Sequence, residues 1–127
     1  MATRSRIGME MPNGEVRSIY CHWDGYPEGV GATLKQHYTD PAKVEALVEL
    51  GDISILGENV APRGGQERSR HSFQNPVEGV TIAYHRDRGE EFRAPRVNAS
   101  VESFSRSDIE EYGYVFTQQG EWETFFG

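Results

Sequence analysis

The chain has 127 residues, of which 36% are hydrophobic and 11% aromatic, and its formal net charge is −7 at neutral pH. This length fits a single domain over residues 1–127, because two separate cores would each approach the size at which disulfides or metals are needed. One cysteine excludes an internal disulfide, and without a leader or an 18-residue apolar run the protein is expected to be neither secreted nor membrane-spanning.

The acidic excess lies in two segments. Residues 21–60 hold seven acids against two bases and residues 97–127 hold six against one, so each carries −5, whereas residues 61–96 carry +2. DNA-binding proteins gain affinity by neutralising phosphates with Lys and Arg, so direct nucleic-acid binding is not expected. An acidic surface is suited instead to a basic partner.

A hairpin and a helix open the chain. Residues 6–11 and 16–22 have strand character, and the Asn-Gly pair between them is a strong turn signal. A breaker-rich turn over residues 23–28 then leads to residues 29–38, where apolar side chains recur one helical turn apart. The sequence therefore predicts two paired strands followed by a first helix.

The second helix has the clearest boundaries. Asp40 is a good N-cap, Pro41 fits the first helical position and Gly51 is placed to end the helix. Residues 57–79 are rich in Gly, Pro, Arg, Ser and Gln without sustained periodicity, which predicts a long mobile loop. Residues 80–84 alternate and are expected to form a third strand.

The C-terminal part is expected to hold one helix and a hairpin. Ser100 can cap a short helix that restarts near Ser107 and stops at Gly113. Residues 114–117 and 121–126 flank a Gln-Gln-Gly turn and predict a terminal hairpin. The order ββααβαββ has no βαβ regularity, so we expect an α+β fold: an antiparallel sheet of about five strands with two to three helices packed on one face.

Residues 20–26 form a corner between the second strand and the first helix. Trp23, Asp24, Gly25 and Tyr26 are interpreted as a structural corner, in which the rings close the core and the glycine permits a tight turn. The glycines here do not match a phosphate-binding loop, since no Lys-Ser or Lys-Thr pair follows them.

Cys21 is the only candidate thiol nucleophile. Alternation along the strand points it away from His22, although a remote His37 or His85 could still approach it. A free cysteine usually packs as a small hydrophobe, and we expect this of Cys21. The Cys and His residues also lack the short paired spacings of structural zinc sites. No catalytic residue, metal or cofactor is therefore predicted.

Three pieces of the chain carry a family resemblance: Tyr-Cys-His-Trp-Asp-Gly-Tyr at residues 20–26, the pair at residues 37–38, and Leu-Gly-Asp-Ile-Ser at residues 50–54. In these pieces the chain resembles a family of small accessory proteins encoded by bacteriophages and prophages, without assigned activity. The resemblance implies a protein of the cytoplasm of an infected bacterial host, and it supplies no residue-level chemistry.

Acidic residues around the second helix and near the C-terminus are the candidate partner-binding surface. In a phage setting, such a surface is expected to compete with nucleic acid for a basic site of a host protein, because carboxylates can take phosphate-like positions. The leading interpretation is a non-enzymatic inhibitor of a bacterial defence component, an anti-CRISPR that acts on a Cascade or Cas protein. The predicted surface consists of Glu45, Glu49, Asp52, Asp108, Glu110, Glu111, Glu121 and Glu123.

Two other readings stay open. In one, His22, Asp24 and Tyr26 converge on a substrate, and the protein binds a small ligand or is an enzyme. In the other, it is a structural phage accessory protein without a host target. The arginines of residues 61–96 are interpreted as members of exposed ion pairs with neighbouring acids, as on an ordinary surface.

Overall fold

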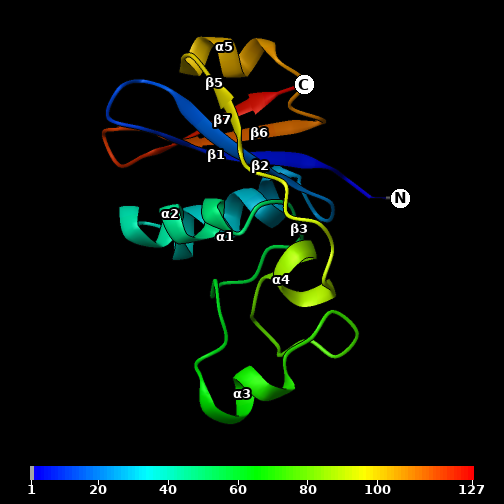
Figure 1. Ribbon diagram of the computed structural model, residues 1–127. Coiled ribbons are helices and arrows are strands. Elements are labelled where there is room, and N and C mark those ends of the chain that lie inside the picture. The colour runs from blue at the N-terminus through cyan, green and yellow to red at the C-terminus, as the bar shows by residue number, and fades with distance from the viewer. Residues whose placement is uncertain (1) are drawn as a thin grey trace.

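A single mixed sheet runs through the molecule (Figure 1). The computed structural model describes residues 2–127. The strand order is β4-β3-β2-β1-β6-β7, and β5 also pairs with β2. The strands are β1 (Ser5–Glu10), β2 (Val16–Cys21), β3 (Ile53–Ile55), β4 (Ile82–Ala83), β5 (Arg96–Asn98), β6 (Tyr112–Phe116) and β7 (Trp122–Phe126).

Two of the strand pairs are parallel, which corrects the expected antiparallel sheet of about five strands. β1 runs parallel to β6, with Ile7 opposite Tyr114, and β2 runs parallel to β3 at Cys21 and Ile53. The other pairs are antiparallel. Parallel neighbours need a long crossover between them. The helices between β2 and β3, and the whole middle of the chain between β1 and β6, provide these crossovers.

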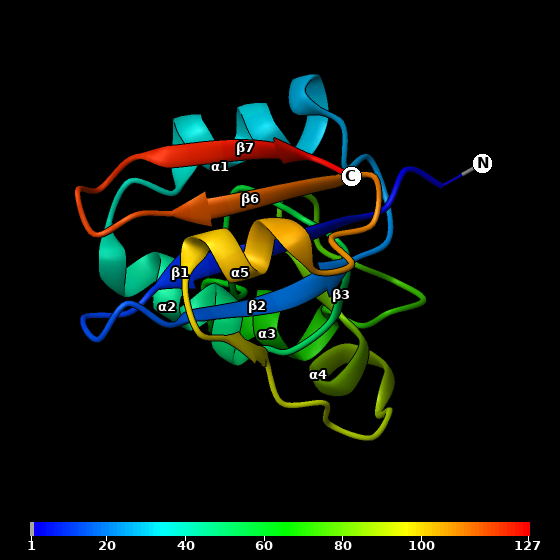
Figure 2. The ribbon, with the colours of Figure 1, turned by 90° about the horizontal axis from the view of Figure 1, so that it is seen from above.

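Helices cover both faces of the sheet, whereas all of them were expected on one face. A π-helical turn (Pro27–Gly31), α1 (Ala32–His37) and α2 (Pro41–Glu49) lie on one face, and α5 (Val101–Arg106) lies over the other (Figures 1 and 2).

The reason is that apolar side chains leave both sides of the central strands. Ile7 and Ile19 join Leu34 and Leu47 in the larger core beneath α1 and α2. Val16 and Val115 join Phe104 and Ile109 in a smaller core beneath α5.

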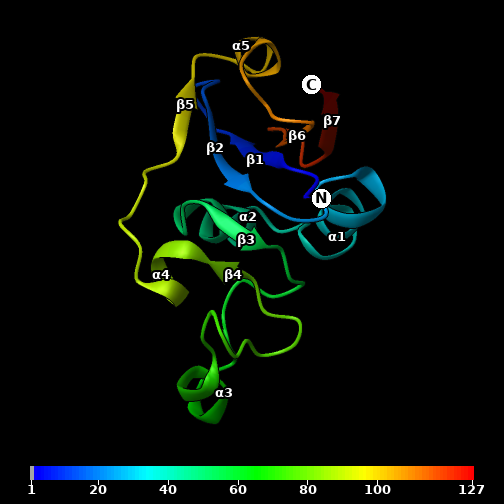
Figure 3. The same ribbon diagram turned by 90° about the vertical axis from the view of Figure 1, so that its right-hand side faces the viewer.

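The middle of the chain holds elements that the sequence pattern does not predict. These are β3, α3 (Gly65–Arg70), α4 (Tyr84–Arg88) and β5. The expected strand over residues 80–84 shortens to β4, because Tyr84 already begins α4. Residues 57–79 contain α3, which lies at the end of the molecule away from α5 (Figure 3). The mobility of this segment stays a prediction.

Several local predictions are confirmed. The Asp40 side chain accepts a hydrogen bond from the Ala42 amide, and Gly51 has the positive φ of a helix stop. The Ser100 side chain caps α5. The terminal hairpin is present as β6 and β7.

The predicted helix restart near residue 107 is wrong. Ile109 is buried from a loop, and Tyr112 already begins β6. Among residues 2–127, no helix has the length and apolar character needed to cross a membrane.

The buried Tyr38 tests the larger core. Its hydroxyl donates to the Gly57 carbonyl at 2.7 Å, and its ring is fully buried. Tyr38→Phe should lower the free energy of unfolding by about 1–2 kcal/mol, because that hydrogen bond is lost in a part-buried site. Tyr26→Phe, at a side chain 38% exposed, should change it by less than about 0.5 kcal/mol. Urea unfolding of both variants checks this, and equal effects would contradict it.

Candidate functional site

Cys21 does not have the surroundings of a nucleophile. It is fully buried in the larger core, as predicted, and its Sγ donates to the Trp23 carbonyl at 3.6 Å. Burial raises the pKa of the thiol to about 12, so the reactive thiolate does not form at neutral pH. His22 instead places its Nδ1 2.7 Å from the Tyr20 hydroxyl.

The corner is closed by backbone, not by rings, which corrects the expected role of Trp23 and Tyr26. Trp23 is 39% exposed and Tyr26 38%. Gly25 lies so close to Ser5 that a Cβ built on it would meet the Ser5 Cβ at 2.8 Å. The Tyr114 hydroxyl also donates to the Gly25 carbonyl at 2.6 Å. Glycine is therefore needed here for close packing, and the two rings are left at the surface.

Asp24 and Tyr26 do not converge with His22 on one site. Asp24 has a left-handed φ of 57°, and its carboxylate lies 3.4 Å from the Tyr26 hydroxyl. Asp24 and Tyr26 are both exposed. His22 faces Tyr20 and contacts Trp23 edge-on, with ring centroids 4.9 Å apart.

A buried ionic network forms in the middle segment. Asp87 accepts hydrogen bonds from Arg86 Nε at 2.8 Å and from the Ala83 amide at 2.7 Å. His71 Nε2 lies 3.2 Å from the same carboxylate, and the His71 side chain is only 2% exposed. Arg86 also donates to the carbonyls of Val60 and Thr81.

The network is a structural clasp and not a base for catalysis. His71 Nδ1 accepts from the Val77 amide at 3.0 Å, whereas the buried Nε2 lies 3.2 Å from the Asp87 carboxylate without completing a hydrogen bond. A general base needs a free nitrogen within reach of a substrate proton. The contacts instead attach residues 60–77 to α4.

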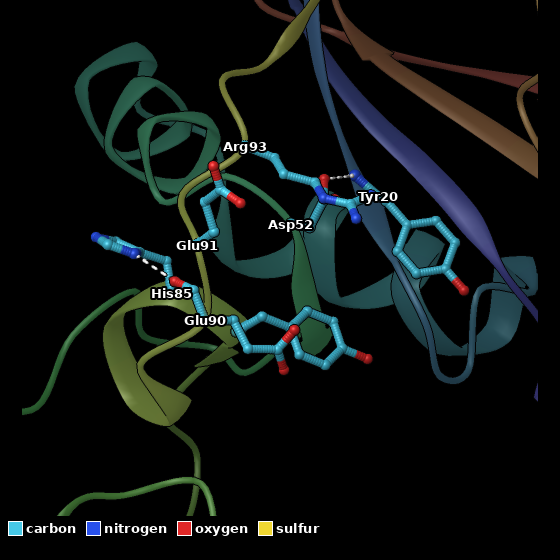
Figure 4. Close-up of a pocket in the computed structure, with 7 residues that line it drawn as sticks. Tyr20, Asp52, His85, Glu90, Glu91 and Arg93 are labelled. Atoms are coloured by element: carbon cyan, nitrogen blue, oxygen red, sulfur yellow. Dashed lines mark hydrogen bonds between the residues drawn. The ribbon is translucent and has the colours of Figure 1, made fainter.

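One cavity of about 190 Å³ combines side chains of several chemical types. Tyr20 and Asp52 lie at one wall with Arg93, and His85 and Glu90 lie at the other (Figure 4). Asp52 accepts from the Tyr20 amide at 3.1 Å, and His85 Nδ1 lies 2.7 Å from the Glu90 carbonyl. The volume is below the range of about 300–1,000 Å³ typical of small-molecule sites. The cavity can therefore take at most a small polar ligand.

The sequence did not indicate this cavity. Its residues come from β2, from the residue before β3, from α4 and from the chain that leads to β5. Only Asp52 was among the predicted site residues. These segments are far apart in the sequence, and the fold brings them together at β3 and α4. Among residues 2–127, no group of three or more His, Cys, Asp or Glu side chains is arranged to hold a metal ion.

Half of the predicted acidic surface is used within the fold. Asp52 holds the Tyr20 amide, and Asp108 accepts from the amide of Glu110. Glu110 pairs with Arg4 at 3.6 Å, and Glu111 accepts from the Arg4 amide. These four carboxylates therefore stabilise turns and the N-terminal segment.

The other half is exposed and free of ion pairs. Glu45, Glu49, Glu121 and Glu123 have no cationic side chain within 4 Å in the part of the chain that the structure describes. The first two lie on α2, whereas the other two belong to the terminal hairpin. Glu123 lies opposite Val115 and so belongs to the sheet face that α5 covers. The eight predicted residues thus do not form one patch.

Trp23→Ala tests the corrected corner. The side chain is 39% exposed, so the substitution should lower the free energy of unfolding by only about 1–2 kcal/mol. Phe104→Ala, at a fully buried ring, should cost about 3–5 kcal/mol. Chemical unfolding of both variants is the measurement. If Trp23→Ala lowers the free energy of unfolding as much as Phe104→Ala does, the Trp23 ring belongs to the core and the correction is wrong.

Asp87→Asn tests the clasp. It should lower the free energy of unfolding by about 3 kcal/mol at pH 7, because Arg86 and His71 lose a buried charged partner. Burial alone would raise the Asp87 pKa, but hydrogen bonds from Arg86 and the Ala83 amide outweigh it and hold the pKa below its usual value. The stabilisation is therefore complete above the unfolded pKa of about 3.9 and is lost as the pH falls through the folded pKa.

Urea titrations at pH 7 and pH 3 should show the difference between wild type and Asp87→Asn shrinking at the lower pH. Glu90→Gln, at an exposed pair with Arg88, is the control and should change the free energy of unfolding by less than about 0.5 kcal/mol at either pH. A difference that stays constant across this range would contradict the prediction.

Comparisons of the chain with protein-family models, curated proteins and solved structures find no match. The resemblance to small phage accessory proteins therefore stays an expectation.

Proposed function

We propose that the protein is a non-enzymatic bacteriophage protein that binds and inhibits a bacterial defence component. Its carboxylates would occupy a basic surface that normally accepts nucleic acid, as on a Cascade or Cas protein, in the cytoplasm of the infected host. The observation that carries the proposal is the pair Glu45 and Glu49, which are exposed on α2 and have no cationic side chain within 4 Å among residues 2–127.

The state of the reactive groups supports a binding role over catalysis. The Cys21 thiol is buried with a raised pKa, and the His71 side chain is buried with its Nδ1 bound to the Val77 amide. His22 and His85 each place Nδ1 at 2.7 Å from a protein oxygen. An activated thiol needs a base within hydrogen-bond reach, whereas the Cys21 Sγ faces the Trp23 carbonyl; the one hydroxyl–imidazole contact among these groups joins Tyr20 to His22.

The charges support a basic partner. The chain carries −7, and the free carboxylates on α2 and on the terminal hairpin add a local negative field. Such a field accelerates encounter with a positively charged surface, and charge-assisted hydrogen bonds to Arg or Lys then hold the complex. The phage setting comes from the family resemblance alone.

A small-ligand role is the second candidate, and the cavity of Figure 4 favours it. It places Arg93, His85 and two tyrosines around a space of about 190 Å³. In this reading the ligand site lies beside Tyr20, and Asp24 and Tyr26 are not part of it.

Charge reversal separates the proposal from this alternative. A pull-down from a bacterial host at moderate salt identifies the partner, and association rates are then measured across ionic strengths. Glu45→Lys with Glu49→Lys should slow association about tenfold at low salt and flatten the salt response, because the steering field is removed.

Arg68→Glu with Arg70→Glu is the control, since both arginines are exposed on α3. Because it makes the protein more acidic, it should not slow association with a basic partner. A salt-independent rate for the wild type, or a larger loss from the arginine pair, would contradict the proposed mechanism. Recovery of a tightly held metabolite and no protein would favour the cavity.

A further inference from the structure

An apolar groove lies between α2, the end of the β1–β2 hairpin and the chain that leads to β5. It consists of two adjoining hollows of about 130 and 320 Å³ that share Met9. Val48 and Phe116, exposed by only 4% and 2%, contribute to its walls, and Phe92 is 44% exposed. Its apolar lining comes mainly from Met9, Met11, Val48, Phe92, Pro95 and Phe116.

The lining is suited to a varied apolar partner. Methionine is unbranched and polarizable, and it adapts its shape to the surface that covers it. Met9 and Met11 are each only partly buried, so their side chains remain available at the groove. The partly exposed ring of Phe92 extends these methionines into a contiguous apolar patch, and such patches mark contact surfaces.

The backbone at the groove leaves no place for an added strand. β1 is paired on both sides, with β2 and with β6, along the residues that include Met9. A peptide that extends a sheet needs free N–H and C=O groups at an edge. The occupant must therefore be recognised through its side chains, as a helix in a groove is.

Charges at the groove select a basic occupant. Glu45 and Glu49 both line it, and they are four residues apart on α2, where like charges repel each other. Glu49 is also the last residue of the helix, at the negative end of its dipole. A cationic side chain would relieve both unfavourable arrangements. Arg17 is the one cation of the lining, and the Glu10 carboxylate is held by the Gln118 amide.

We infer that this groove is the docking site for a basic amphipathic helix of the partner. The apolar face of that helix covers Met9, Met11 and Phe92, and its Lys or Arg side chains pair with Glu45 and Glu49. The inference rests on the proposed function for the basic character of the partner, and it adds where and in what form the partner is held.

Methionine-methyl NMR tests this directly, because the chain has three methionines and two of them line the groove. The probe is a 16-residue peptide of Leu and Lys at helical spacing, and the control is the same composition scrambled so that no apolar face forms. The Met9 and Met11 signals, assigned with Met9→Leu and Met11→Leu, should shift saturably with the helical peptide only. Equal binding of the scrambled peptide, or unmoved Met9 and Met11 signals, would overturn the inference.

Two double variants with the same change in net charge show which carboxylates contribute to peptide binding. Glu45→Lys with Glu49→Lys should weaken peptide binding at least tenfold, whereas Glu121→Lys with Glu123→Lys, outside the groove lining, should weaken it less than threefold. Equal weakening by both pairs would mean that only net charge matters and would overturn the inference. Circular dichroism confirms that each variant is folded.

Phe92→Ser distinguishes this inference from the proposed function. If Phe92→Ser loses peptide binding while the wild-type protein does not inhibit any defence complex, the groove inference holds and the proposed function is wrong. If Glu45→Lys with Glu49→Lys abolishes binding to the identified defence partner but Phe92→Ser leaves it within twofold, the acidic mechanism stands and the groove does not.

Discussion

The need to cover both faces of the β1–β2 pair governs the architecture. Ile7 and Ile19 leave one side of these strands, and Val16 leaves the other, so a single layer of helices would expose one apolar set. The helices after β2 cover the first side, and α5 with the loop at Ile109 covers the second. The parallel strand β6 completes both cores, because Tyr114 and Val115 point to opposite faces.

The face beneath α5 is the more polar of the two. Arg6 is only 7% exposed, and it donates from Nε to the Ser18 hydroxyl and from Nη2 to the Ser18 carbonyl. Burial, with Arg96 nearby, lowers the Arg6 pKa to about 10, which still leaves the guanidinium charged at neutral pH. Taking a charge out of water is unfavourable, and the hydrogen bonds to Ser18 offset part of this cost. The larger core therefore has to supply most of the stabilisation.

The sequence predicted those elements whose signals are local. The caps of α2 and α5 and the two hairpins each depend on residues within a few positions of one another, and all were found. β3 and β5 have only three residues each, too few for a period of two to be visible, and only β4 of the alternating run at residues 80–84 is a strand. The parallel pairs depend on contacts between distant segments. Trp23 was expected in the core but is exposed, because the burial of a ring depends on which side chains from distant segments fill the core.

Charge counting found the acidic residues but could not say which are free. Asp52 and Glu111 accept hydrogen bonds from backbone amides, whereas Glu45 and Glu49 have no ion-pair partner in the part of the chain that the structure describes. Only the fold separates carboxylates that stabilise turns from carboxylates that remain available. The groove beside α2 was likewise invisible, since Met9 and Phe92 are more than eighty residues apart.

The fold also separates the two signs of charge in space. The His71–Asp87–Arg86 clasp attaches the middle segment to α4, and α3 with its exposed Arg68 and Arg70 lies at the end of the molecule away from α5 (Figure 3). The carboxylates of α2 lie instead beside the sheet. In the proposed complex with a basic partner, such a field would orient the molecule as well as attract it, with α2 toward the basic surface and α3 away from it. In that complex, the arginines of α3 would help to set the direction from which the partner is approached.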